Sequence, residues 1–149
     1  MELPKRILVP VDFTSTSERA LDYAVDLARQ LGASVTVLHA YEIPVLGFPD
    51  GALVATADVA SRLSLSAQSA LDGVLEARSD RGVTLLKELR QDVPWEAINA
   101  VAEEINADLI IIGTHGRRGL ARALLGSVAE NVIRTSTRPV LTIRGPRED

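Results

Sequence analysis

DLIIIGTHGRRGLARALLGSV, residues Asp108 to Val128, contains the strongest indication of the fold class in the sequence. Its opening residues, Asp108 to Ile112, form the clearest buried strand of the sequence, because a continuously apolar run is typical of a parallel strand with helices on both faces. A segment rich in glycine and arginine follows the strand. Gly126 then opens a helix that we predict to end near Thr135. A strand, a glycine-rich loop and a helix in this order indicate a β-α unit.

Outward from this stretch, short apolar runs alternate with longer segments whose apolar residues have helical spacing. We predict strands at residues 7–11, 34–39, 83–89, 108–112 and 140–144, and helices at about 15–31, 58–79, 94–105 and 127–135. This alternation indicates an α/β fold, in which helices cover both faces of a parallel sheet. Ser15 and Glu18 have the form of a capping box for the first helix. Gly32 and Gly82 are predicted to end the first two helices.

The alternation is interrupted between Tyr41 and Asp58, where proline and glycine are frequent. This segment is long for a loop in a compact domain. It is either a simple insertion or a functional lid, and as a lid we expect it to become ordered when a ligand binds.

Charge is distributed unevenly along the 149 residues. The first 112 residues hold 9 basic and 17 acidic side chains, whereas the last 37 hold 7 basic and 3 acidic ones. This basic C-terminal quarter indicates either an anion site or only a face on which arginine collects.

The composition excludes several classes of protein. The sequence has no cysteine, so disulfides and thiolate zinc sites are excluded, and two histidines leave little for a multi-histidine metal site. No apolar run approaches the roughly 18 residues of a membrane helix. The N-terminus lacks a signal-peptide core, so we expect a cytoplasmic protein. A net charge of −4 argues against bulk nucleic-acid binding.

In parallel α/β sheets, ligands bind outside the carboxyl ends of the strands, where the strand order reverses. Here those ends are Pro10-Val11-Asp12 and Ile112-Gly113. Gly113 and Gly116 permit close approach of the backbone to a ligand, and the helix that begins at Gly126-Ser127 directs free amides toward it. Arg117 and Arg118 add positive charge. The pattern favours a phosphate site, although no lysine follows as in a P-loop.

Several of these residues have a purely structural interpretation as well. Ser127 and Glu130 have capping-box spacing, and Asp12 can cap the turn that follows its strand. His39 and His115 are interpreted as polar residues at a strand end and in a loop rather than as catalysts. Trp95 is interpreted as a packing or interface residue.

The motif Gly-x2-Gly-x9-Gly-Ser, formed by Gly113, Gly116, Gly126 and Ser127, resembles the nucleotide-binding motif of the ATP-binding universal stress proteins. Similarity covers nearly the whole chain. The opening strand and turn (residues 7–14), the second strand (37–40) and the C-terminal segments (126–133 and 138–141) are similar to that family.

The resemblance implies a flavodoxin-like, Rossmann-like α/β fold, a three-layer sandwich with a five-stranded parallel sheet in the order 3-2-1-4-5. Residues 1–149 would form a single domain. ATP would bind between the ends of strands 1 and 4. Asp12 would contact adenine or ribose, and the adenine pocket would be lined by Pro10, Val11 and Ala40.

For the rest of the nucleotide, the resemblance places Ile112, Gly113 and Gly116 along ribose and phosphate. The phosphates would be held by Arg117, Gly126, Ser127 and Val128, and Thr114 is counted with the ATP-binding residues. Mg2+ or Mn2+ would bind through the phosphates, with few or no protein ligands. Homodimers would form through the last strand, Val140 to Arg144, and an exposed edge strand favours such pairing.

The leading hypothesis is a cytoplasmic ATP-binding protein that acts as a nucleotide-dependent stress-response or signalling module. One alternative is a slow ATPase or autophosphorylating enzyme, with Ser127 or Thr114 as acceptor; the sequence offers arginines but no evident base beyond His115 or Asp12. The other is a dimeric scaffold that binds nucleotide weakly.

Overall fold

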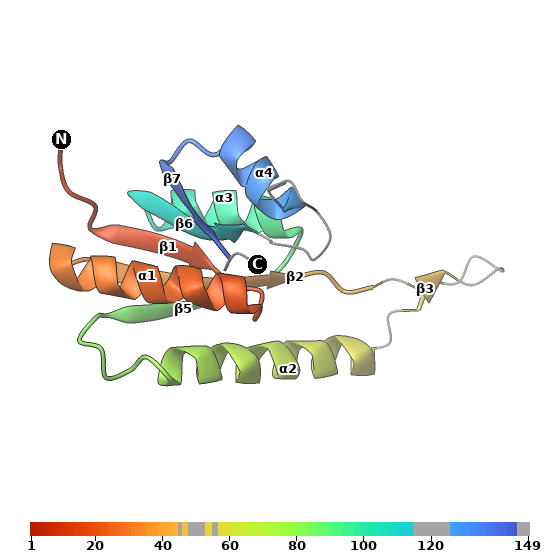
Figure 1. Ribbon diagram of the computed structural model, residues 1–149. Helices are drawn as coiled ribbons and strands as arrows, with labels where there is room; N and C mark the ends of the chain where they lie inside the picture. The colour runs from red at the N-terminus through yellow and green to blue at the C-terminus, as the bar shows by residue number, and fades with distance from the viewer. Residues whose placement is uncertain (45, 48–52, 55–56, 115–125, 146–149) are drawn as a thin grey trace, which may run out of the picture.

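Five parallel strands form the central sheet of the protein, which we describe from a computed structural model (Figure 1). The described residues are 1–44, 46–47, 53–54, 57–114 and 126–145. The strands are β1 (Arg6–Pro10), β2 (Ser34–Tyr41), β5 (Leu85–Gln91), β6 (Leu109–Thr114) and β7 (Val140–Arg144). Their order is β5-β2-β1-β6-β7, which is the predicted 3-2-1-4-5 when the five strands are counted along the chain.

Helices cover both faces of the sheet, as the alternating pattern predicts. The helices are α1 (Ser15–Leu31), α2 (Ala57–Glu76), α3 (Pro94–Glu104) and α4 (Ser127–Thr135). Ile7 and Val9 of β1 belong to the core under α1 and α2, whereas Leu8 belongs to the core under α3 and α4. Because side chains of a strand alternate between faces, a continuously apolar β1 supplies both cores. The three-layer α/β sandwich is confirmed (Figure 1).

The parallel register brings the carboxyl ends of three strands to one edge of the sheet. β1 pairs with β2 from Arg6↔Ser34 to Pro10↔Leu38, and on its other side with β6 at Ile7↔Leu109 and Leu8↔Ile110. The strand order reverses at β1, so a ligand site is expected where these ends meet.

The first helix begins differently from the prediction. Its N-cap is Thr14, whose hydroxyl oxygen accepts a hydrogen bond from the Ser17 amide at 3.3 Å. Glu18 lies one position too far along for a capping box with Thr14, and its carboxylate instead pairs with Arg78 at 3.6 Å. The predicted Ser15–Glu18 capping box is therefore wrong. The predicted C-cap is confirmed, since Gly32 has a left-handed φ of 66°.

We expect Thr14→Ala to lower the free energy of unfolding by about 1 kcal/mol, because the Ser17 amide loses its capping acceptor. The matched control Ser15→Ala should change it by less than about 0.5 kcal/mol. Urea unfolding followed by circular dichroism measures both. An equal loss in the two variants would restore Ser15 as the cap.

The end of helix α2 and both ends of strand β5 also differ from the prediction. Helix α2 ends at Glu76, a hydrogen-bonded turn follows, and Gly82, with a φ of 75°, lies in the approach to β5 rather than at the helix end. Strand β5 runs from Leu85 to Gln91, two residues later than expected at each end. It is an edge strand with mostly half-buried or exposed side chains, so its hydrophobic pattern defines the boundaries poorly.

The interrupted segment from residue 41 to 58 contains more regular structure than the sequence indicated. Strand β2 continues to Tyr41, and two short strands, β3 (Leu46–Gly47) and β4 (Leu53–Val54), form an antiparallel pair. Helix α2 already begins at Ala57. Residues 45, 48–52, 55 and 56 lie outside the described part, so the expected ordering on ligand binding stays a prediction. No helix in the described part is long and apolar enough to cross a membrane.

Candidate functional site

A small, mainly apolar pocket of about 100 Å³ lies at the point where the strand order reverses. Its walls come from the carboxyl ends of β1, β2 and β6 and from the first turns of α1, α3 and α4. The lining residues are Pro10, Val11, Asp12, Ser17, Leu38, Ala40, Pro94, Ile98, Ile112, Gly113, Val128 and Ala129. The pocket therefore lies where the sequence places the ligand site.

Most of the predicted ATP-binding residues that the structure describes line this pocket. They are Pro10, Val11, Asp12, Ala40, Ile112, Gly113 and Val128. Thr114 does not line it: its side chain is buried, and its hydroxyl donates to the Ile143 carbonyl of β7 at 3.4 Å. Gly116 and Arg117 lie outside the described residues, as do His115, Arg118 and Arg122.

Gly126 and Ser127 form the start of α4, directly before Val128 of the pocket wall. Gly126 is the N-cap, with no side-chain capping bond, and Ser127 is the exposed first residue of the helix. The interpretation of Ser127 as a cap is therefore wrong. Glu130 pairs its carboxylate with Arg134 at 2.7 Å instead. The first-turn amides of α4 form a partial positive charge beside the pocket.

The turn after β1 is held by a compact set of hydrogen bonds. The Asp12 carboxylate accepts from the Thr14 amide at 3.1 Å and from the Thr14 hydroxyl at 2.5 Å, and the Asp12 amide donates to the Ser17 hydroxyl at 3.2 Å. Between them Phe13 has a left-handed φ of 64°, which is uncommon for a residue other than glycine. Asp12 both caps this turn and lines the pocket. A role as a cap is therefore compatible with a role as a ligand contact.

The edge of β2 presents main-chain groups to the pocket. Even-numbered residues of β2 direct their N–H and C=O toward β1, since Ser34 donates to the Lys5 carbonyl at 2.9 Å and Leu38 accepts from the Val11 amide at 2.8 Å. Ala40 is the next residue on this side, and the paired part of β1 ends at Pro10. The N–H and C=O of Ala40 consequently lie beyond the last rung of the β1–β2 ladder, beside the pocket.

Three groups with shifted pKa values lie elsewhere and have structural causes. Main-chain amides of Lys5 and Arg6 donate to Asp108 and hold its pKa below the usual range, at the opposite edge of the sheet. Arg138 and Thr137 donate to Glu103 and lower its pKa. Hydrogen bonds to the Glu104 carboxylate raise the pKa of Arg90.

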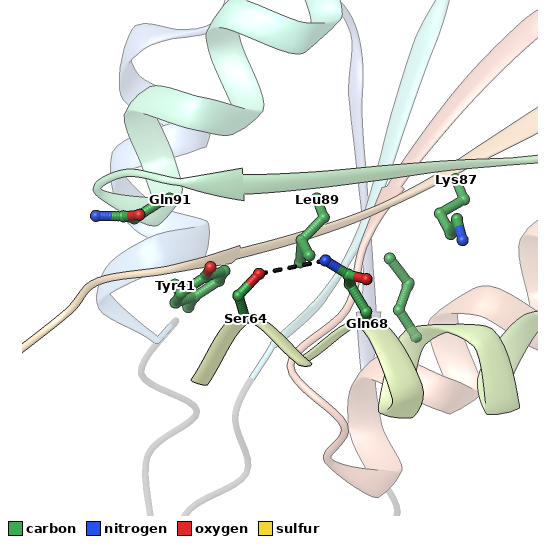
Figure 2. A pocket seen from close by; sticks show the side chains of 7 residues that line it. Tyr41, Ser64, Gln68, Lys87, Leu89 and Gln91 are labelled. Atoms are coloured by element: carbon green, nitrogen blue, oxygen red, sulfur yellow. Dashed lines mark hydrogen bonds between the residues drawn. The ribbon is translucent and has the colours of Figure 1, made fainter. Parts of the chain in front are cut away.

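A larger hollow of about 390 Å³ lies between α2 and the outer strand β5 (Figure 2). It is lined by Tyr41, Ser64, Gln68, Leu71, Lys87, Leu89 and Gln91. Three of its polar side chains already have partners: Gln68 donates to Ser64 at 3.2 Å, and Lys87 pairs with Asp72 at 2.7 Å. It also lies away from the reversal of strand order, so we place the functional site at the smaller pocket.

Five lining residues were not predicted from the sequence: Ser17, Leu38, Pro94, Ile98 and Ala129. Pro94 and Ile98 come from α3, whose first turn follows the carboxyl end of β5. Right-handed crossovers bring the start of each helix to the same edge of the sheet as the strand ends. That rule is the signal that identifies these two residues.

Gly113 has a packing role as well as a place in the pocket wall. A Cβ atom at this position would lie 2.9 Å from the main-chain oxygen of Thr16 in α1. We expect Gly113→Ala to cost about 1–3 kcal/mol of folding free energy, because backbone must move to admit the methyl group. Thermal unfolding measures this.

Gly73 supplies the matched control, since a Cβ there meets no atom within 4 Å. Because Gly73 lies in helix α2, Gly73→Ala should stabilise the protein by about 0.5–1 kcal/mol. A Gly113→Ala protein as stable as the wild type would show that α1 does not pack this closely on β6.

Comparison with known proteins gives one family. The model of the universal stress protein family matches residues 4–144. The universal stress protein MJ0531 of Methanocaldococcus jannaschii is 34% identical over 99% of this chain and 86% of its own length. The universal stress protein MJ0577 of the same organism is 29% identical over 94% of each chain.

Solved structures agree with this result. The structure of MJ0577 aligns with a TM-score of 0.78 at 27% identity, covering 97% of this chain and 98% of the other. A universal stress protein in complex with cAMP aligns at 0.71 and 25% identity, covering 96% and 98%. One from Archaeoglobus fulgidus in complex with dAMP aligns at 0.68 and 25% identity, covering 93% and 97%. This chain belongs to the universal stress protein family.

Proposed function

We propose that this protein binds ATP in the pocket at the ends of β1 and β6 and acts as a nucleotide-dependent stress-response or signalling module of the cytoplasm. The observation that carries the proposal is the combination, at one place, of an apolar pocket, the start of α4 and a main-chain edge at Ala40 that no described residue of β1 pairs with. Related structures that hold cAMP and dAMP support an adenine nucleotide as the ligand.

The pocket suits the adenine base. Its side chains are mainly apolar, and a planar heterocycle buries its faces well against such walls. The N–H of Ala40 can donate to N1 of adenine, while its C=O can accept from the N6 amino group. Asp12, at the mouth beside β1, can accept hydrogen bonds from the ribose hydroxyls.

The phosphates would extend toward the first turn of α4, where the amides following Gly126 and the exposed Ser127 hydroxyl offer donors. Arg117, outside the described residues, would add a cation. A bound Mg2+ or Mn2+ would neutralise phosphate charge and be held mainly by the phosphates. Among the described residues there is no cluster of three His, Cys, Asp or Glu side chains able to hold a metal.

We further propose that residues 1–149 act as a single domain and that two copies associate through β7. In the described part of the chain β7 pairs with β6 alone, so its other edge is available to a second chain. Nucleic acid and membrane are not proposed as partners.

Titration with a fluorescent ATP analogue, displaced by unlabelled ATP, tests the proposal. We expect saturable binding, and we expect Gly126→Val to weaken it by about tenfold or more, because a branched side chain at the N-cap crowds the phosphates and disfavours the cap. Gly73→Ala should bind as the wild type does. Absence of saturable binding at millimolar nucleotide, or unchanged binding by Gly126→Val, would contradict the proposed site.

A further inference from the structure

The hydrogen-bond ladder between β1 and β2 ends at Val11, whose carbonyl binds a side chain instead of a main-chain amide. In a regular parallel ladder, the Val11 amide donates to the Leu38 carbonyl and the Val11 carbonyl accepts from the Ala40 amide. The first bond is formed, at 2.8 Å. In place of the second, the Val11 carbonyl meets Nδ1 of His39 at 2.7 Å. Because a carbonyl only accepts, His39 donates from Nδ1.

The His39 ring is held in this orientation by its neighbours. The Phe13 ring lies 4.4 Å from it between centroids, at an interplanar angle of 44°. The Tyr41 ring lies nearly parallel to it, with centroids 6.1 Å apart and an angle of 13°. Tyr41 in turn lines the larger hollow (Figure 2). The His39 imidazole is half-buried and contacts two aromatic rings, so its side chain already has few accessible rotamers. The hydrogen bond to the Val11 carbonyl therefore restricts it little further, and its geometry is well defined.

Both contacts of His39 act on the same turn. Its Nδ1 binds the carbonyl of Val11, and its ring supports Phe13, whose left-handed φ of 64° reverses the chain after Asp12. The chain thereby leaves the sheet at the point where β2 continues to Ala40 and Tyr41. A strand that stayed in the sheet here would cover the N–H of Ala40.

We propose that His39 is a positioning residue of the nucleotide site: its side chain takes the place of a main-chain rung, which leaves the Ala40 N–H available to the edge of a base. The proposal rests on the adenine site proposed above and deepens it. It assigns recognition of the base to the main-chain N–H and C=O of Ala40, which the His39 side chain keeps from pairing with β1. His39 lies on the opposite face of β2 from the pocket and is not among the residues that line it.

Amide hydrogen exchange of the full chain, measured without nucleotide, tests whether the His39 side chain replaces the main-chain hydrogen bond from Ala40 to Val11. In the wild type, the Ala40 amide should exchange much faster than the Leu38 amide, which lies inside the ladder. His39→Phe keeps a ring for Phe13 and Tyr41 but has no donor, so the Val11 carbonyl should capture the Ala40 amide and slow its exchange at least about tenfold. His39→Asn, whose amide nitrogen can replace Nδ1, should retain fast exchange.

Binding of AMP and of its 1-deaza analogue, which lacks the N1 acceptor, tests the consequence for recognition. The wild type should favour AMP by about tenfold, as expected for one hydrogen bond. His39→Phe should reduce this preference to near one, and His39→Asn should restore it. Val74→Ala, a core variant on the buried face of α2, should lower stability but keep the preference.

The outcomes separate the two proposals. If the wild type binds neither nucleotide, the proposed function fails, while the exchange rates still decide the role of His39. If the wild type prefers AMP and His39→Phe retains that preference, or if the Ala40 amide exchanges equally in both proteins, His39 has no positioning role.

Discussion

Ala40→Leu should weaken ATP binding by about thirtyfold or more while the protein stays folded. Ala40 lines the pocket from β2, and a pocket of about 100 Å³ cannot hold both a leucine side chain and a base. The larger side chain also removes access to the Ala40 main chain, so apolar and polar contacts are lost together. Isothermal titration calorimetry with ATP measures the effect.

Ala70→Leu is the matched control for this variant, because Ala70 is exposed on α2 and lies outside the pocket. It adds the same side chain and should leave the affinity unchanged. Circular dichroism confirms the fold of both proteins. If Ala40→Leu binds ATP as tightly as the wild type, the nucleotide does not occupy this pocket.

Arg78→Met should produce the largest loss of stability among charged-residue variants that we predict. Arg78 is only 6% exposed and joins the turn after α2 to α1: Nε donates to Asp22 at 2.8 Å and Nη1 to the Val74 carbonyl at 2.9 Å. Glu18 lies 3.6 Å from Nη2. Methionine keeps the packing of the side chain but leaves the carbonyl and both carboxylates without this partner.

The expected cost is about 2–4 kcal/mol, below that of a fully buried pair, because both carboxylates remain partly exposed to water. For a chain of this length, the melting temperature should fall by about 5–15 °C. Differential scanning calorimetry measures the change. Arg62→Met is the control, since Arg62 is exposed and its contact to Asp58 is 3.9 Å long, so it should cost less than about 0.5 kcal/mol. Equal effects would show that the Arg78 cluster does not hold the end of α2 to α1.

Much of the fold follows from hydrophobic periodicity in the sequence. Buried parallel strands such as β1 and β6 have apolar centres, and α1 has a regular apolar stripe, so the bounds of β1 and α1 are predicted to within one residue. Strand β6 is predicted in the right place but ends two residues later than expected, at Thr114. The edge strand β5 is predicted two residues too early, because its limits are set by pairing with β2, from Val35↔Leu85 to Tyr41↔Gln91, and not by burial. The order of the strands follows from the family resemblance rather than from periodicity.

The residues of the candidate site are likewise only partly predictable from the sequence. Strand ends at Asp12 and Gly113 are identified by position in the sequence, since a parallel sheet gathers them at one edge. The contributions of Ile98 and Ala129 depend on how α3 and α4 pack, which local pattern does not specify. His39 was interpreted only as a polar residue at the strand end. Its bond to the Val11 carbonyl spans 28 residues and is visible only in the folded chain.

An amide NMR titration of the uniformly 15N-labelled protein with AMP shows whether an adenine nucleotide occupies the pocket at the ends of β1 and β6. We expect saturable shifts at Val11, Asp12, Ala40, Gly113 and Val128, the amide-bearing residues that join the pocket walls from β1, β2, β6 and α4. Shifts confined to Ser64, Gln68 and Gln91, around the larger hollow, would show that the nucleotide does not bind in this pocket, as would a spectrum that AMP does not change.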